Sequence, residues 1–159
     1  MIEKLNEEYM RLAIKQARKN IKSLDGGPFG ACIVKGNEIL SVARNLVLVR
    51  DATSHAEINA IRAASRKIKS FDLSGCIIYS TTEPCPMCFC AIHWARIDMI
   101  VYGTTITDVK KLGFSELVIS NDKMRDMGNS DVKIIHRFLL DECASLLKEW
   151  DSLENKVFY

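Results

Sequence analysis

Two short clusters of potential metal ligands carry the chemistry of this sequence. His55 is followed two positions later by Glu57, and Cys85 is followed three positions later by Cys88. One imidazole and two thiolates make three protein ligands of a tetrahedral zinc site, and the open fourth position holds water in catalytic sites. We therefore predict that His55, Cys85 and Cys88 bind a catalytic zinc ion.

Glu57 is predicted to carry protons rather than to bind the metal. It lies about 200° around a helix from His55, so the two side chains cannot reach one ion from the same face. Zinc lowers the pKa of its water toward about 7, and a neighbouring carboxylate can accept that proton, protonate a ring nitrogen and then protonate a departing amine. The two clusters also match the H-x-E…P-C-x-x-C signature of zinc deaminases. Both arguments predict hydrolytic deamination.

The alternative is a closed zinc site that only stabilises a non-enzymatic binding module, and such a site requires a fourth protein ligand. We expect His93 and His136 to be ordinary hydrogen-bonding residues, because neither belongs to a paired ligand motif. The other cysteines are expected to be small buried apolar residues of the core. They are Cys32, Cys76, Cys90 and Cys143.

Both clusters are predicted to lie at helix N-termini. A helix capped by Thr53 or Ser54 would place His55 at its start. A second helix over about residues 85–96 would place both cysteines of the metal cluster on one face of its first turn. The helix N-terminus favours the thiolate forms that bind metal.

The remaining pattern predicts an α/β sheet that brings these two helix starts together. Strand, helix and strand follow one another over residues 76–103, which is typical of parallel strands covered by helices. A hairpin around residues 35–38 would add an antiparallel edge. Residues 106–130 show no clear period. The strands are expected over residues 31–34, 39–43, 76–80, 99–103 and 132–135, and the first and last helices over residues 3–22 and 139–150.

Size and composition narrow the possible classes of protein. The chain has 159 residues, of which 48% are hydrophobic and 26% charged, with a net charge of +2. These values predict one domain over residues 1–159 with its own core, and they exclude a disordered chain. The small net charge predicts no strong attraction to nucleic acid, and no apolar run is long enough to cross a membrane. Because the N-terminus lacks a secretion signal, we expect a cytoplasmic, reducing setting.

Four segments of the sequence, which include the two clusters, resemble those of a known family. They are residues 26–30, Asp51 with residues 54–57, residues 83–88 and residues 91–96. Over about residues 3–103 the sequence resembles the cytidine deaminase-like superfamily of zinc nucleobase and nucleoside deaminases, and within it the bacterial guanine deaminases. The resemblance implies a three-layer α-β-α fold with a mixed five-stranded sheet between helices. It also implies a homodimer that can exchange C-terminal segments, so that a terminal tyrosine, here Tyr159, closes the site of the neighbouring subunit.

The same resemblance implies roles for residues that would bind the substrate. Phe29 would stack on the base, and Trp94 would line the pocket. Asn45 and the backbone of Ala56 would bind ring and carbonyl groups. Glu116 matches the place of a second acidic residue, which would accept N–H groups of guanine and assist proton transfer. The alternative for the aromatic residues, Tyr159 included, is packing, and the alternative for Glu116 is a solvated charge.

Two departures from the guanine deaminase pattern leave the substrate open. The loop over residues 45–55 is shorter, so Arg44 could take the place of Asn45. Residues 141–147 are similar to the final helix of tRNA adenosine deaminases, which need a basic surface for an RNA stem-loop. We expect deamination of a free purine base, guanine to xanthine and ammonia. Adenosine in tRNA, cytosine or another small base or nucleoside is the alternative substrate. A basic surface could come from Arg62, Arg66, Lys67, Lys69, Lys110 and Lys111.

Overall fold

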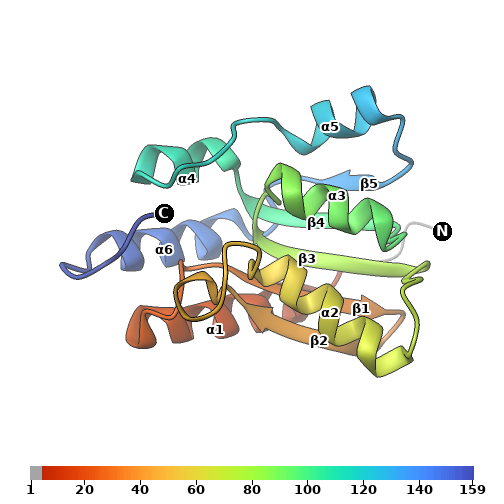
Figure 1. Cartoon of the computed structure of the whole chain (residues 1–159), viewed down its shortest axis with the longest axis horizontal. Helices are drawn as coiled ribbons and strands as arrows, with labels where there is room; N and C mark the ends of the chain where they lie inside the picture. Colours follow the sequence, from red (N-terminus) through yellow and green to blue (C-terminus); the bar gives the residue numbers. More distant parts are fainter. Residues whose placement is uncertain (1–4) are drawn as a thin grey trace.

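The computed structural model describes residues 5–159, which form a mixed five-stranded sheet with helices on both faces (Figure 1). The strands are β1 (Gly30–Lys35), β2 (Glu38–Arg44), β3 (Cys76–Thr82), β4 (Met99–Thr104) and β5 (Lys133–Ile135). Their order is β2-β1-β3-β4-β5, and β1 is antiparallel to both of its neighbours. β3, β4 and β5 run parallel to one another. The predicted parallel pair and antiparallel edge hairpin are confirmed.

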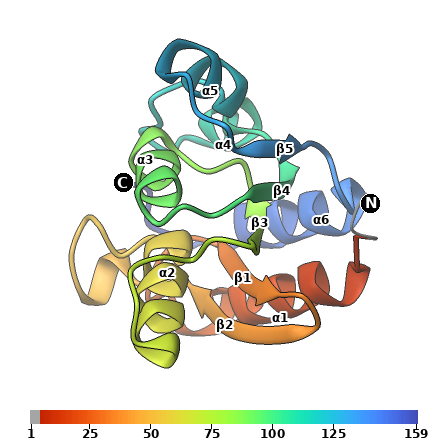
Figure 2. The ribbon, with the colours of Figure 1, turned by 90° about the vertical axis from the view of Figure 1, so that its right-hand side faces the viewer.

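Helices cover both faces of this sheet, which confirms the three-layer α-β-α fold (Figure 2). One face carries α1 (Glu7–Ser23) and α6 (Leu140–Asp151), and the other carries α2 (Ala56–Ile68) and α3 (Pro86–Trp94). The adjacent residues Ile78 and Tyr79 of β3 belong to two different apolar cores, one under each helix layer. None of the helices within residues 5–159 is long and apolar enough to span a membrane.

The two helix starts that carry the candidate metal ligands are built alike. The N-cap of α2 is His55, and no side chain caps this helix, so the predicted cap at Thr53 or Ser54 is wrong. Both of those residues instead form hydrogen bonds with Asp51 in the preceding loop. The N-cap of α3 is Cys85. His55 and Cys85 therefore hold equivalent positions, each directly before the first turn of a helix.

Residues 106–130, where the sequence showed no period, contain two short helices. α4 (Ile106–Leu112) begins with a capping box between Thr105 and Asp108 and ends at Gly113, whose φ is 114°. α5 (Asn121–Gly128) begins after the N-cap Ser120. Caps at the ends of these helices, rather than a long apolar stripe, mark them in the sequence. The loop of residues 113–120 between them carries no regular structure.

The cysteines outside the metal cluster separate into two groups. Cys32, Cys76 and Cys143 are buried, as predicted. Cys90 was expected in the core but is exposed, because α3 turns Phe89 rather than Cys90 toward the core. The structure also places residue 7 at the start of α1, and residues 3 and 4 of the predicted first helix lie outside the described residues.

Candidate active site

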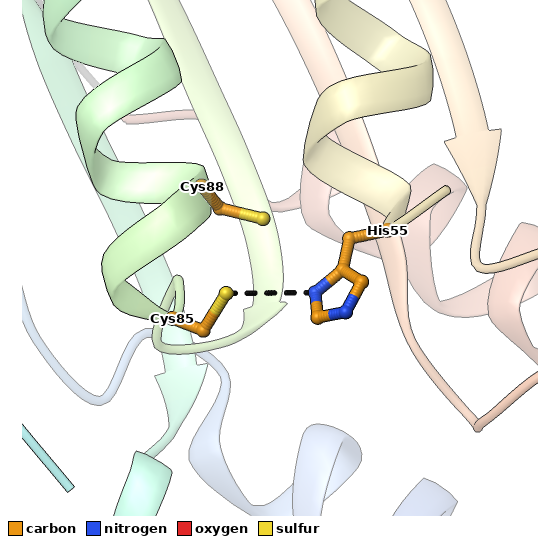
Figure 3. A group of neighbouring side chains, drawn as sticks. All are labelled: His55, Cys85 and Cys88. Carbon is orange, nitrogen blue, oxygen red and sulfur yellow. Dashed lines mark hydrogen bonds between the residues drawn. The ribbon is translucent and has the colours of Figure 1, made fainter. Parts of the chain in front are cut away.

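The three candidate metal ligands meet where α2 and α3 begin (Figure 3). Both helices lie on the same face of the sheet, so their N-termini come together. Nδ1 of His55 lies 3.5 Å from Sγ of Cys85. The ligand atoms of His55, Cys85 and Cys88 all lie within 4.8 Å of one another. The structure therefore brings together three residues that two distant segments contribute.

Proline and the helix start shape the cysteine half of the cluster. Pro86 is the first residue of α3, where its missing N–H costs nothing. Cys88 lies in the first turn, on the same side as Cys85. The hydrogen bond from Cys88 outweighs burial and, together with His55, lowers the pKa of Cys85 to about 4. Burial raises the pKa of Cys88 instead. Cys85 is therefore the sulfur of the pair that is ready to bind metal as a thiolate.

This set of donor atoms fits zinc. One imidazole nitrogen and two sulfurs are preferred zinc ligands, and three protein ligands leave a tetrahedral position for water or substrate. Within residues 5–159, the group of potential ligands contains these three residues and no fourth. The closed structural site that the alternative requires is therefore not assembled here.

Glu57 lies beside the metal cluster in a buried position. Its Oε1 accepts a hydrogen bond of 2.9 Å from the hydroxyl of Ser80, at the end of β3. Its Oε2 lies 3.4 Å from Sγ of Cys88. Burial raises the pKa of the Glu57 carboxyl, although the neighbouring His55 and the Ser80 hydrogen bond act in the opposite direction. Both oxygens of this carboxyl thus have a protein partner, and Oε2 is the one that faces a metal ligand, where a proton acceptor is useful.

A small cavity adjoins this cluster. Its free volume is about 20 Å³, which is room for roughly one water molecule. A base can therefore enter only if part of the lining moves. The lining residues are Phe29, His55, Glu57, Thr82, Glu83, Cys85, Glu116 and Tyr159.

Glu116 reaches the cavity from the loop between α4 and α5. Burial, and then the nearby Cys85 thiolate, raise the pKa of its carboxyl to about 7. Phe114 holds this part of the loop, because it is buried and packs edge-on against Phe29 at 5.2 Å and against Tyr159 at 5.4 Å. The side chain of Glu116 is thus a second carboxyl beside the metal cluster.

Tyr159, the last residue, lies over the cavity of its own chain. Its hydroxyl accepts a hydrogen bond of 2.9 Å from the backbone N–H of Gly27. Its carbonyl accepts another of 2.9 Å from the N–H of Ser115, next to Glu116. Gly27 must be glycine here, because a Cβ atom would collide with the ring of Phe29 and with the hydroxyl of Tyr159. Burial raises the pKa of Tyr159, so its phenol stays protonated and can donate a hydrogen bond.

Three residues expected to contact the substrate do not line the cavity. Asn45 is 1% exposed, and its Oδ1 accepts from the N–H of Val47 while its Nδ2 has no partner. Ala56 is buried as the first residue of α2. Trp94 is 77% exposed and lines a separate groove with Met124. Within a single chain, Trp94 is therefore not brought to the site.

Three polar residues near the site were not predicted to act there. Ser80 orients Glu57, and Thr82 and Glu83 line the cavity. The sequence feature that could have identified them is the run of polar residues that ends an otherwise apolar strand, directly before the metal-binding cysteines. The two histidines outside the site behave as predicted, since His93 bonds Ser130 and His136 bonds Asp122.

Comparisons with known proteins agree with this geometry. Residues 3–104 match the cytidine and deoxycytidylate deaminase zinc-binding region. The guanine deaminase of Bacillus subtilis is 34% identical over 155 residues, covering 97% of this chain and 99% of that protein. The tRNA-specific adenosine deaminase of Aquifex aeolicus is 38% identical over 154 residues, covering 95% and 97%. A solved guanine deaminase from Nitrosomonas europaea superposes with a TM-score of 0.84 at 28% identity, covering 94% of this chain and 86% of that one.

Proposed function

The chain belongs to the family of the cytidine and deoxycytidylate deaminase zinc-binding region, and on that premise we propose that it deaminates guanine to xanthine and ammonia. It is a zinc-dependent aminohydrolase. The presence of a second carboxyl in the cavity supports a purine base as the substrate. Glu116 faces the same cavity as Glu57. Guanine presents N–H groups that can donate hydrogen bonds to such a carboxylate. Deamination of cytosine does not require a second carboxylate.

His55, Cys85 and Cys88 hold the metal in this proposal. When bound, zinc supplies the Lewis acidity that makes water nucleophilic near neutral pH. Glu57 would accept a proton of the attacking water on Oε2, the oxygen on the side of Cys88, while Ser80 holds Oε1. Glu57 would then give this proton to a ring nitrogen, take the second proton from the oxygen added to the ring carbon, and give that proton to the departing amine. The raised pKa of this carboxyl suits a group that must both accept and return a proton.

Recognition of the base is proposed to use the walls of the cavity and its margin. Phe29 stacks on the purine ring, and Glu116 accepts N–H groups of its pyrimidine edge. Asn45 offers the unpartnered Nδ2 donor to a ring or carbonyl acceptor once the cavity opens. Ala56 can donate its backbone N–H, because the first N–H groups of α2 have no partner within the helix. Tyr159 closes the cavity over the bound base.

Deamination of adenosine in tRNA is the second candidate, favoured by the similarity to the Aquifex aeolicus enzyme. The C-terminal tail argues against it. Tyr159 is tied to Gly27 and Ser115 on two sides of the cavity, and an RNA strand would have to displace both contacts. Ammonia release from guanine, guanosine, adenine, cytosine and tRNA separates the candidates. Turnover of tRNA adenosine without turnover of guanine would refute the proposal.

We also propose that the enzyme is a cytoplasmic homodimer. The face around α3 exposes Trp94 and Met127, at 77% and 76%, and a groove beside them is lined mainly by apolar side chains. Large exposed apolar side chains of this kind suit a subunit interface. A second subunit could also bring its own Trp94 toward the site or exchange its C-terminal segment. The described cysteines are all unpaired, which suits a reducing compartment. Sedimentation of the protein and of Trp94→Ser tests the dimer.

A further inference from the structure

Glu83 is a buried carboxylate that the proposed chemistry does not use. It lies between the end of β3 and the metal ligand Cys85. Its backbone N–H donates to the carbonyl of Thr104 at the end of β4, at 2.8 Å. Its Oε2 accepts from the N–H of Ile106 at 3.1 Å, and its Oε1 accepts from the N–H of Asn121 at 2.8 Å. Both oxygens are thus engaged by the protein itself.

The two donors are the first residues of two different helices. Ile106 begins α4, and Asn121 begins α5. The first N–H groups of a helix lack partners within it and carry partial positive charge, so a carboxylate stabilises them strongly. The side chain of Asn121 adds a second link, because its Nδ2 donates to the carbonyl of Pro84 at 2.6 Å. One carboxylate therefore joins the starts of both helices to the metal-binding segment.

The loop of residues 113–120 lies between these two helices and carries Glu116. Within the described residues, no hydrogen bond holds the carboxyl of Glu116, so its position depends on how its backbone is anchored. Within the loop, Phe114 packs edge-on against Tyr159, and the N–H of Ser115 donates to the carbonyl of Tyr159. Two links connect the ends of the loop to the metal-binding segment: the Glu83 carboxylate, which accepts from Ile106 and Asn121, and the Asn121 side chain, which donates to Pro84.

We propose that Glu83 is a positioning residue that fixes the carboxyl of Glu116 relative to the metal ligand Cys85. This inference rests on the proposed function, in which Glu116 contacts the base. In this arrangement, loss of one Glu83 hydrogen bond shifts α5 or α4 and moves Glu116 away from the substrate. The metal ligands stay in place, because Cys85 and Cys88 are held by α3.

The test compares two capping carboxylates of the same region in the zinc-loaded protein. Glu83→Gln keeps the size of the side chain but leaves one helix N–H facing an amide donor. Asp108→Asn is the matched control, because within residues 5–159 the side chain of Asp108 accepts only from Thr105, in the capping box of α4. We expect Glu83→Gln to lower kcat/KM for guanine about 10- to 100-fold, as a displacement of roughly 1 Å can do. Asp108→Asn should change it about twofold or less.

Coupling to Glu116 separates positioning from general damage. In a Glu116→Gln background, Glu83→Gln should have little further effect on kcat/KM, because its effect passes through Glu116. Zinc content should stay at the wild-type level. Multiplicative losses, or loss of zinc, would overturn the inference. If Glu83→Gln does not fold, Glu83→Asp keeps the charge but shortens the side chain, which weakens its hold on the two helix N–H groups, and it must show the same coupling to Glu116.

Hydrogen exchange gives a readout that needs no substrate. Amides of residues 113–121 should exchange faster in Glu83→Gln than in Asp108→Asn or the wild type. Equal exchange in all three proteins would overturn the inference. A wild-type protein that does not deaminate guanine would refute the proposed function instead, while the exchange rates still decide whether Glu83 anchors the loop.

Discussion

Replacement of Glu57 by Gln would test the proposed proton transfer most directly. The isosteric amide keeps an oxygen for Ser80, whose hydroxyl lies 2.9 Å from Oε1. It replaces Oε2, which lies 3.4 Å from Sγ of Cys88, by a neutral amide nitrogen that cannot accept a proton. Positioned acid–base groups contribute about 10²- to 10⁴-fold to rates. We therefore expect kcat to fall by that factor, equivalent to roughly 3 to 5 kcal/mol of barrier.

Zinc content and stability separate this effect from unfolding. Burial raises the pKa of Glu57 in the folded protein above its unfolded value. The stability that such a group contributes is complete below its unfolded pKa and is lost as the pH rises through its folded pKa. A neutral amide does not lose this stability, so the melting temperature of Glu57→Gln at pH 8 should equal or exceed that of the wild type. Ammonia release within about tenfold of the wild type, in a variant with full zinc, would refute the assigned role.

The remaining predictions concern the cavity and the metal. Burial and Cys85 raise the pKa of Glu116 to about 7, so kcat/KM for guanine should rise with pH through that region, and Glu116→Gln should lose this limb of the profile. Gly27→Ala should raise KM about tenfold or more, because its Cβ collides with the ring of Phe29 and then with the hydroxyl of Tyr159, whereas Gly128→Ala meets no atom and should change little. Cys85→Ser should lose zinc, as metal analysis would show, since the remaining two ligands hold the ion poorly.

The metal site could be predicted from the sequence because local rules govern most of it. A histidine and a cysteine that each precede a helix, with a second cysteine one turn on, need only two helices on the same face of one sheet to converge. The β-α-β pattern supplied that arrangement. Even the wrong cap at Thr53 or Ser54 did not matter, since a shift of one or two residues still leaves His55 at the helix start.

The walls of the cavity could be predicted less well, because tertiary contacts place them. α4 and α5 are short, so their apolar period is weak, and a carboxylate from another segment, Glu83, contacts the start of each. Cys90 was expected in the core because a cysteine outside a metal cluster is usually buried, and only the packing of α3 shows that its side of the helix is exposed. Likewise, the contact between Tyr159 and Gly27 joins positions 132 residues apart.

In the proposed function, chemistry and substrate choice depend on separate parts of the fold. The metal ligands and Glu57 lie at helix starts packed on the main core, whereas Phe29 and Tyr159 pack around Phe114 in a smaller cluster with Trp150. A substitution in this smaller cluster can reshape the cavity while the metal cluster keeps its geometry. Relatives with the same zinc-binding region can therefore act on guanine or on tRNA adenosine. The composition of the cluster around Phe114, more than the metal motif, should decide which substrate a member of the family accepts.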